Sequence, residues 1–391
     1  MPLRIVIDVR RLKDFGIGTY IRNLVQALGT LDRENRYVLV ATPADARDLT
    51  ALPANFQTKI YGRLESDLVN HITFPLFLKN FEADLFHIPL NAVPLFMPKP
   101  YVVTIHDMSS LLFGERPGMR KNLWLYQFRR GLLRADKVIA VSSATSRDVE
   151  NLLGIPSERI CQVYNAPDPK FIQQPPAADA RAAGPQVRWL EQRRILERYQ
   201  INYPFLLYAG TIRPQKNILR LVEAFAVVRG DLEGHPVWKD LRLIIIGDEI
   251  SKYPSVRRAV IQTRAQQVVR FLGFVPFDTM RMFYESATAF IFPSLYEGFG
   301  LPPLEAMASG TPVVTSDSSS LPEVVGDAAV LVNPENVFDI ARGIREVLLD
   351  ENLRAELIRR GYQQVERFSW EHTARQVLAI YQEVAKSHGA R

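Results

Sequence analysis

Short apolar runs alternate with amphipathic stretches through the first 166 residues of the chain. Each run is apolar at successive positions, which is typical of strands buried on both faces of a parallel sheet. The stretches between them, such as 17–31 and 142–154, have the spacing of amphipathic helices. This alternation predicts an α/β domain with helices on both faces of its sheet. The expected strands are 3–9, 37–42, 83–89, 101–107, 135–142 and 159–165.

The pattern breaks at 167–200, where a stretch rich in Pro, Ala and Gln precedes a charged helical segment. Such composition is typical of a linker. The alternation then restarts and ends in a helical region. We therefore predict two doubly wound, Rossmann-like domains, 1–168 and 201–367, joined by a hinge at 169–200. The strands expected in the second domain are 205–211, 241–248, 268–273, 289–294, 312–317 and 328–334.

The carboxyl ends of the expected strands are the first places to look for chemistry. In open α/β sheets, ligands bind beyond these ends. Two such domains facing each other would form a deep interdomain cleft, which is a frequent place for a binding site.

Composition narrows the class of protein. The chain has 391 residues, of which 47% are hydrophobic, and a formal net charge of +6. This basic balance favours phosphates, nucleic acid or an anionic membrane surface as partners, although a mildly basic soluble protein needs none of them. The single cysteine, Cys161, fits a reducing compartment.

The sequence lacks several recognisable signals. No apolar run reaches the roughly 18 residues of a transmembrane helix, and the N-terminus has the wrong order of apolar and basic residues for a signal peptide. We therefore expect a cytoplasmic protein. The histidines have no metal-ligand spacing and no Asp-x-Asp pair occurs, which argues against a divalent metal site.

The strongest candidate site follows the expected strand 289–294. Glu297 lies on a glycine-rich turn, and the double proline 302–303 is expected to open a short helix with Glu305 in its first turn. Carboxylates placed there can accept hydrogen bonds from hydroxyl groups, and Glu305 can take a ribose in this way. The alternative is that these acidic residues only stabilise the start of the helix.

The turn between the glutamates is also a candidate anion site. The backbone N–H groups of Phe299, Gly300 and Leu301 are expected to point out of the helix N-terminus, where they suit a diphosphate. Arg213 and Lys216 follow the first strand of the second domain and can neutralise such a group. The alternative is that they are two solvated residues of a turn.

The first domain offers weaker candidates. Gly16 and Gly18 make a flexible turn into a helix, which suits a phosphate or a sugar ring. The complete G-x-G-x-x-G dinucleotide pattern is not present, because position 21 is Ile. His106 ends the strand 101–107, where it either meets a substrate or is a satisfied edge histidine.

These segments together resemble the retaining glycosyltransferases of family 4, a group with the GT-B fold. The segment EGFGLPPLE is similar to the E-x7-E motif of that family, and the other segments follow in the family's order along the chain. This sequence departs from the family pattern at Thr211 and Gln215, where an arginine is common, and at 165–168, which replaces Asn-Gly-x-Asp. The other similar segments are TIHD, AVSSATSRDV, GTIRPQKN, FLGFVP, IFPSLYEGFG, TPVVTSDSSSLPEVVGDAAVLVNP and FSWEHTARQVLAIYQEV.

The resemblance implies that the second domain binds a nucleotide sugar and the first domain binds the acceptor. It implies that Glu305 holds the ribose and that Glu297 contacts the hydroxyls of the donor sugar. It places His106 on the same sugar, near the reacting carbon.

The diphosphate is the next part of the implied ligand. Arg213, Lys216 and the amides of 299–301 would hold it, and Gly16 and Gly18 would lie against the diphosphate or the acceptor. The resemblance implies no metal and no other cofactor. It also implies a last helix, within 368–391, that crosses back onto the first domain.

The implied reaction is retaining, metal-independent hexosyl transfer to a glycan or polyprenyl-linked acceptor, without nucleic acid as a partner. The resemblance is closest to bacterial mannosyl- or rhamnosyltransferases of polysaccharide assembly, such as that of lipopolysaccharide, which favours mannose and a GDP- or dTDP-linked donor. Two alternatives stay open. One is a nucleotide-sugar epimerase of the same fold, and the other is an inactive subunit that only binds the nucleotide sugar.

The basic, aromatic stretch 119–134 raises a separate question. It can lie on an anionic membrane and deliver a lipid-linked acceptor, which would place the protein at the inner face of that membrane. The alternative is a helix with its apolar side in the core and its basic side in water.

Overall fold

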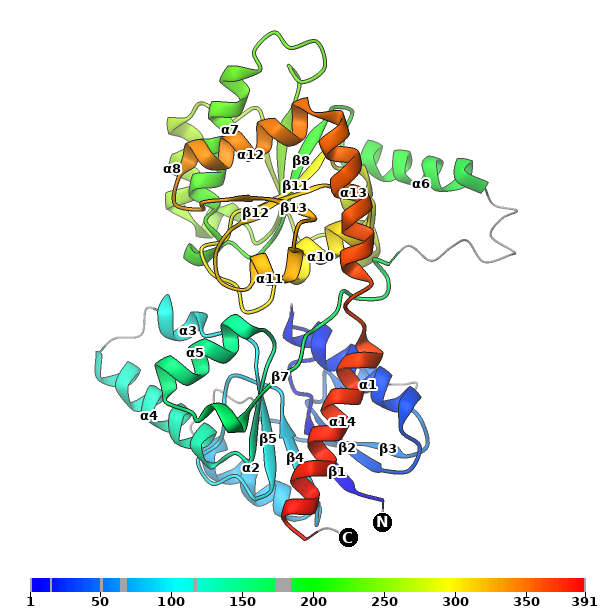
Figure 1. Ribbon diagram of the computed structural model, residues 1–391, viewed down its shortest axis with the longest axis vertical. Helices are drawn as coiled ribbons and strands as arrows, with labels where there is room; N and C mark the ends of the chain where they lie inside the picture. The colour runs from blue at the N-terminus through cyan, green and yellow to red at the C-terminus, as the bar shows by residue number, and fades with distance from the viewer. Residues whose placement is uncertain are drawn as a thin grey trace. The chain divides into compact units, whose positions relative to one another are not determined.

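The computed structural model describes residues 2–14, 16–49, 52–63, 69–114, 118–172 and 184–389. The chain divides into two compact units (Figure 1). We call Met1–Ala166 together with Phe368–Arg391 the first unit, and Pro167–Arg367 the second unit.

The first unit is built on a seven-stranded parallel sheet. Its strand order is β3-β2-β1-β4-β5-β6-β7, so the order reverses between β1 and β4. The strands are β1 Arg4–Asp8, β2 Arg36–Ala41, β3 Phe56–Ile60, β4 Leu85–Ile88, β5 Tyr101–Ile105, β6 Lys137–Ala140 and β7 Ile160–Gln162. The helices of this unit are α1 Ile17–Leu31, η1 Ala46–Asp48, α2 Asn70–Lys79, α3 Ser109–Leu112, α4 Gly118–Arg134, α5 Ser143–Leu153, η2 Ser157–Arg159 and α14 Trp370–Ser387.

The second unit is built on a six-stranded parallel sheet of order β10-β9-β8-β11-β12-β13. Its strands are β8 Phe205–Gly210, β9 Arg242–Gly247, β10 Val269–Gly273, β11 Ala289–Phe292, β12 Val313–Ser316 and β13 Ala329–Val332. Its helices are α6 Gly184–Arg198, η3 Pro214–Lys216, α7 Ile218–Asp231, η4 Ile250–Lys252, α8 Pro254–Gln262, α9 Phe277–Ser286, α10 Leu301–Ala308, α11 Leu321–Val325, α12 Val337–Leu349 and α13 Glu351–Val365.

The fold prediction of two doubly wound α/β sheets is confirmed, with one strand missed. Every strand expected from an apolar run is present. Nine of them are mostly buried: β1, β2, β4, β5, β6, β8, β9, β11 and β12. The missed strand, β3, lies at the edge of its sheet, and only Phe56 of its five residues is buried. An edge strand needs no apolar run, so the sequence carries no signal for it.

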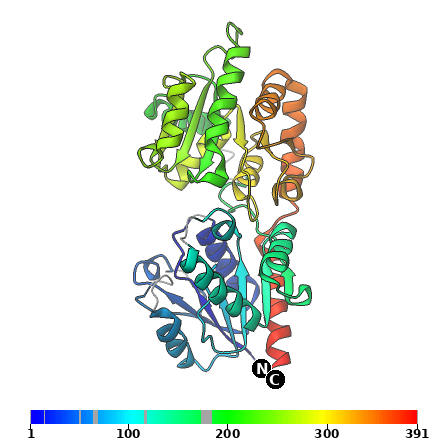
Figure 2. The ribbon, with the colours of Figure 1, turned by 90° about the vertical axis from the view of Figure 1, so that its left-hand side faces the viewer.

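The last helix belongs to the first unit. α14 packs against α1, and the Thr373 hydroxyl donates a hydrogen bond to the Tyr164 carbonyl at 2.7 Å. Figures 1 and 2 both show α14, in red, running along the first unit.

The stretch expected to be a hinge is helical in its second part. α6 packs against α9 of the second unit, and the Gln192 amide donates to the Glu285 carboxylate at 2.8 Å. Residues 173–183 of the expected hinge lie outside the described residues. Within the part of the chain that the structure describes, no helix is both long and apolar enough to cross a membrane.

Candidate functional site

The strand order of the second unit reverses between β8 and β11, and the loops after these two strands are tied together. The Leu295 amide donates to the Gln215 carbonyl at 2.8 Å, and the Asn217 side chain donates to the Pro293 carbonyl at 3.0 Å. Asn217 is buried and adopts a left-handed backbone with φ of 60°. A ligand crevice is expected at such a reversal, so these loops form the candidate site of this unit.

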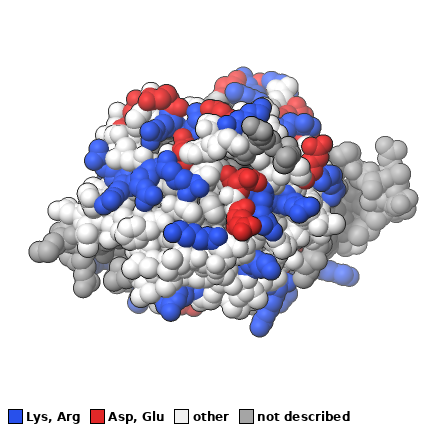
Figure 3. Space-filling model, turned by 90° about the horizontal axis from the view of Figure 1, so that it is seen from below, with Lys and Arg blue, Asp and Glu red and all other residues white. Residues whose placement is uncertain are grey.

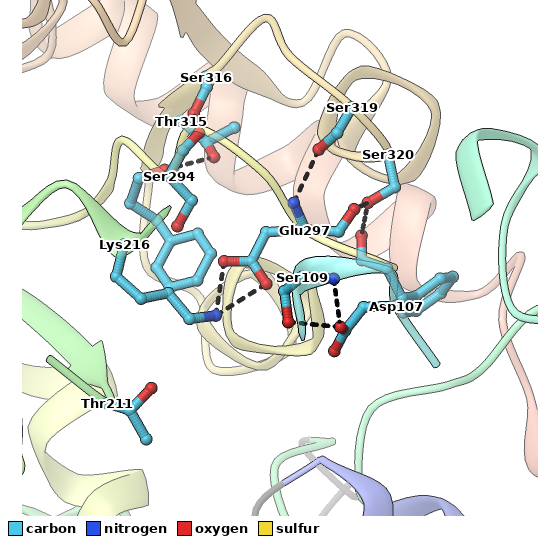
Figure 4. A network of polar contacts seen from close by, with 12 residues as sticks. Asp107, Ser109, Thr211, Lys216, Ser294, Glu297, Thr315, Ser316, Ser319 and Ser320 are labelled. Carbon is cyan, nitrogen blue, oxygen red and sulfur yellow. Dashed lines mark hydrogen bonds and ion pairs between the residues drawn. The ribbon is translucent and has the colours of Figure 1, made fainter. Parts of the chain in front are cut away.

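The centre of the candidate site is an ion pair between Lys216 and Glu297. The Lys216 Nζ atom lies 2.6 Å from Oε1 and 2.8 Å from Oε2 of Glu297 (Figure 4). The side chains are 18% and 11% exposed, and Nζ lies 5.4 Å from the centre of the Phe292 ring. The structure thus brings together two residues that sequence reasoning selected from different motifs.

Two serines hold the turn that carries Glu297. The Glu297 amide donates to Ser319 Oγ at 2.9 Å, and the buried Ser320 hydroxyl lies 2.9 Å from the Glu297 carbonyl and 2.7 Å from the Phe299 carbonyl (Figure 4). These contacts fix the backbone to which the carboxylate is attached. The sequence analysis did not select Ser319, Ser320 and Asn217, because their side chains hydrogen-bond to backbone groups. The serine run before α11 was a visible signal of a helix start.

Gly300 makes the entry into α10 geometrically possible. Its φ is 111°, in a region that L side chains rarely adopt, and an added Cβ atom would lie 2.8 Å from the Leu321 side chain. A residue other than glycine would therefore strain this turn.

The helix after the turn begins one residue earlier than expected. α10 starts at Leu301, so that Glu305 lies in the second turn and not in the first. Pro302 and Pro303 have no N–H group, so the N–H groups at this helix start are those of Leu301 and the residues before it, Phe299 and Gly300.

Glu305 has an unusual electrostatic environment. It is partly exposed, and its Oε2 accepts a hydrogen bond of 3.3 Å from the buried Tyr284 hydroxyl. Burial and the neighbouring Asp168 carboxylate raise the pKa of Glu305 to about 8, against a smaller lowering effect of Tyr284. Near neutral pH, which is below this pKa, the carboxyl group therefore keeps its proton even with the Tyr284 hydrogen bond.

Arg213 lies at the start of η3 and is exposed. Its charge acts on the Tyr253 phenol, whose pKa is raised by burial and by Asp248 and lowered in part by Arg213. The Tyr253 hydroxyl and the Ile212 amide both donate to the Asp248 carboxylate, at 3.0 and 2.9 Å. Arg213 is thus on the same loop as Lys216, with its charge beside a phenol.

In the first unit, the expected glycine turn is the start of α1. Gly16 precedes the helix with φ of 69°. A Cβ atom on Gly18 would lie 2.3 Å from the Leu12 carbonyl oxygen, so close packing within this turn already requires a glycine there. This packing is enough to explain why position 18 is a glycine, whether or not a ligand binds there. It does not explain Gly16, where an added Cβ atom would have no neighbour within 4 Å.

His106 is buried directly after β5. Its Nε2 lies 3.0 Å from the Pro89 carbonyl, its amide donates to Asn91 Oδ1 at 3.1 Å, and its ring meets that of Tyr20 edge to face at 4.9 Å. A carbonyl only accepts, so Nε2 carries a proton and Nδ1 is the acceptor of the neutral ring. Burial lowers the pKa of His106 to about 4, although the Pro89 carbonyl and Asp107 oppose it.

Comparison with known families covers most of the chain. Residues 16–171 match the family described as Glycosyltransferase Family 4, and residues 191–364 match Glycosyl transferases group 1. The O-antigen chain mannosyltransferase B of Escherichia coli is 31% identical over 308 residues, which are 78% of this chain and 75% of the relative. The serotype-specific mannosyltransferase WbdA of Escherichia coli is 30% identical over 71% of this chain, which spans only 33% of WbdA.

A solved structure shows the same fold. HepE of Anabaena, determined in complex with UDP and glucose, superposes with a TM-score of 0.73 over 97% of this chain and 100% of HepE. The sequence identity is 16%, so this similarity concerns the fold alone.

Proposed function

This chain belongs to the glycosyltransferases, with a family 4 match in its first half and a group 1 match in its second, and from this premise we propose a specific reaction. The protein transfers a hexose, with mannose favoured, from a nucleoside diphosphate sugar to a hydroxyl group of a glycan or lipid-linked acceptor. The mannose preference follows the printed activities of the two Escherichia coli relatives.

The observation that carries the proposal is the Lys216–Glu297 ion pair beside the start of α10. A lysine ammonium group and the N–H groups at the start of a helix both favour a diphosphate. Glu297 then accepts hydrogen bonds from the hydroxyl groups of the sugar, and Glu305, in the second turn of α10, accepts those of the ribose. Arg213 adds positive charge on the same loop as Lys216.

The proposed reaction retains the configuration of the sugar and needs no metal. The acceptor hydroxyl attacks from the face that the diphosphate leaves, the carbon–oxygen bond to the diphosphate breaks, and the leaving phosphate oxygen takes the acceptor proton. The main task of the protein is then to stabilise the charge of the leaving diphosphate and to orient the sugar. We assign the first task to Lys216 and the second to Glu297 and His106.

The first unit contributes His106 and the turn before α1. The neutral imidazole of His106 offers Nδ1 as an acceptor, which suits a sugar hydroxyl. Gly16, at the head of α1, is proposed to lie against the diphosphate or the acceptor, as is Gly18.

The choice of donor is tested by ligand-dependent melting with UDP-, GDP-, ADP- and dTDP-linked sugars. A ligand that binds only the folded protein raises the melting temperature, and at equal concentration a tighter ligand raises it more. GDP-mannose is expected to give the largest shift. A larger shift with a UDP- or ADP-sugar would overturn the donor preference but leave the reaction class standing.

Product analysis separates this reaction from the two alternatives. With a radiolabelled nucleotide sugar, a transferase moves the label to an acceptor, an epimerase returns a new nucleotide sugar, and an inactive subunit leaves the donor unchanged. The paired Lys216 and Glu297 favour transfer, since an epimerase needs further acid and base groups beside the sugar.

We also propose that α4 contacts an anionic membrane surface, so that the protein works at the inner face of a membrane. Phe128 and Leu132 of this helix are buried, whereas Leu123 and Tyr126 are 58% and 59% exposed, so the helix packs one face in the unit and leaves apolar side chains exposed on another. Figure 3 shows Lys and Arg side chains spread over the face seen from below in Figure 1.

The test of membrane contact avoids the arginines that hold α4 in place. Arg129 donates to the Leu153 carbonyl and Arg134 to the Leu95 carbonyl, so that reversing either charge would disturb the packing. Leu123→Asp with Arg130→Glu changes only exposed positions. Loss of co-sedimentation with phosphatidylglycerol vesicles would support the contact, and unchanged binding would contradict it.

A further inference from the structure

Buried polar side chains in the core of the first unit form a continuous chain of hydrogen bonds. The His87 Nδ1 atom lies 2.6 Å from the Tyr381 hydroxyl, and its Nε2 lies 2.8 Å from Thr104 Oγ1. Thr104 Oγ1 in turn lies 3.1 Å from the Tyr20 hydroxyl. All of these residues are 0% exposed. We call them the buried relay: Tyr381, His87, Thr104 and Tyr20.

The buried relay joins parts of the first unit that are far apart in the sequence. Tyr381 lies on α14, His87 on β4, Thr104 on β5 and Tyr20 on α1. Positions 87 and 381 are 294 residues apart, and α14 packs against α1. Buried polar groups lower the free energy of unfolding unless they are hydrogen-bonded. Packing alone could have been achieved with apolar side chains.

His87 is neutral, so its two ring nitrogens have different hydrogen-bond roles. Burial, followed by the charge of His106, lowers the pKa of His87 to about 3. A neutral imidazole donates from one nitrogen and accepts at the other, so the hydroxyls on its two sides have opposite roles. In either tautomer, losing one hydroxyl leaves a buried nitrogen of His87 without its partner.

At one end of the buried relay, the Tyr20 ring contacts His106. The ring of Tyr20 is fixed at its hydroxyl by Thr104, and it meets the His106 ring edge to face at 4.9 Å. The same Tyr20 ring meets that of Trp370, at the start of α14, at 5.9 Å. Among the described residues, the titratable groups beside His106 include Tyr20 from α1, His87 from β4 and its neighbour Asp107.

We propose that the buried relay positions the imidazole of His106, so that the C-terminal helix α14 helps to set the geometry of the transfer step. This inference rests on the role given to His106 under the proposed function. The relay residues are positioning residues, because they act on the substrate only through His106.

The test replaces single hydroxyl groups at constant shape. Thr104→Val keeps a β-branched residue in β5 and removes the hydroxyl, while Thr104→Ser keeps it. Tyr381→Phe removes the other hydroxyl beside His87. Tyr101→Phe is the matched control, since Tyr101 also lies buried in β5 but bonds the Gly131 carbonyl outside the relay.

The first readout is the NMR titration of the His106 imidazole, which needs no substrate. In the wild type and in Tyr101→Phe, the ring is expected to titrate near pH 4. In Thr104→Val and Tyr381→Phe, the looser ring gains water and its pKa rises toward the ordinary value of 6.5. An unchanged titration in Thr104→Val would overturn the proposal.

The second readout is transfer from radiolabelled GDP-mannose. We expect kcat to fall about tenfold in Thr104→Val and Tyr381→Phe and to be restored in Thr104→Ser, with the donor KM unchanged. If His106→Ala is inactive while both relay variants keep the wild-type kcat, the positioning role of the buried relay is refuted and the proposed function stands. If His106→Ala keeps the wild-type kcat, the role of His106 is refuted, and with it the link from the relay to transfer.

Discussion

Lys216 and Glu297 lie 81 positions apart in the sequence, and the two carboxylate oxygens of Glu297 are 2.6 and 2.8 Å from the Lys216 ammonium group. Both side chains are mostly buried, so water screens the pair less than it would at the surface. The lysine charge is therefore balanced before any donor binds. An incoming diphosphate must compete with, or share, this pairing.

The first prediction concerns Lys216→Gln. This variant keeps a polar side chain that is one bond shorter and removes the charge, which leaves the Glu297 carboxylate beside the proposed diphosphate position. Affinity for GDP is expected to fall about 10- to 100-fold, or roughly 1.4 to 2.8 kcal/mol. Isothermal titration calorimetry measures the change.

Lys239→Gln is the control for that experiment. Lys239 is exposed and precedes β9, at the end of the sheet opposite the candidate site. Equal losses of GDP affinity in the two variants would show that only the net charge matters and would contradict the assignment of Lys216.

The second prediction separates the two members of the pair. Glu297→Gln removes the partner that competes for the lysine, so GDP affinity is expected to stay equal or to rise. The transfer rate is expected to fall by about 100-fold or more, because the amide holds the hydroxyl groups of the sugar less strongly. A variant that loses GDP affinity but keeps kcat would place Glu297 on the diphosphate, contrary to the proposal.

The third prediction follows from the raised pKa of Glu305. The folded protein keeps a proton on this carboxyl up to a pH of about 8, whereas the unfolded chain loses it near 4.5. Between these values the folded state binds more protons, so this group lowers the free energy of unfolding as the pH rises from 5 to 8. Glu305→Gln should therefore show a flatter pH dependence of the melting temperature, and an identical dependence in both proteins would refute the shift.

The same carboxyl group makes donor binding depend on pH. Ribose hydroxyls donate to an ionised carboxylate, so binding below pH 8 requires the loss of a proton. Affinity for GDP-mannose is expected to increase between pH 6 and 8, by at most about tenfold per unit, and to lose this increase in Glu305→Gln. Calorimetry in buffers of different ionisation enthalpy measures the released proton directly.

The fourth prediction concerns the turn before α10. Gly300→Ala forces a side chain into a backbone with φ of 111° and against Leu321, so the free energy of unfolding should fall by about 1 to 3 kcal/mol. Gly230→Ala, on α7, is the control, because an added Cβ atom there has no neighbour within 4 Å. Urea titrations of both variants test the difference, and equal stability would show that the turn is not strained.

Much of the fold could be predicted from the sequence, since buried parallel strands leave apolar runs that turns and helices separate. The strand β3 could not, because an edge strand needs no apolar run and four of its five residues are at least partly exposed. The start of α10 was also misplaced by one residue. The double proline at 302–303 marks a helix start, but it does not exclude a helical residue before it.

The candidate site was predicted in part. Lys216 and Glu297 were selected separately, and no motif indicates that they pair in the structure, because that contact depends on the adjacency of β8 and β11. Asn217, Ser319 and Ser320 were missed, since hydrogen bonds to backbone groups leave no distinctive motif. The raised pKa of Glu305 depends on burial and on Asp168, neither of which spacing reveals.

The most direct test of the central claim is transfer of radiolabel from GDP-mannose to a panel of mannose-terminated glycolipids, followed by NMR of the product's anomeric centre. We predict labelled glycolipid with the α configuration of the donor retained, formed by the wild type and lost in Glu297→Gln. A product of inverted configuration would contradict the retaining mechanism. Release of a new nucleotide sugar without any labelled glycolipid would contradict the transferase itself.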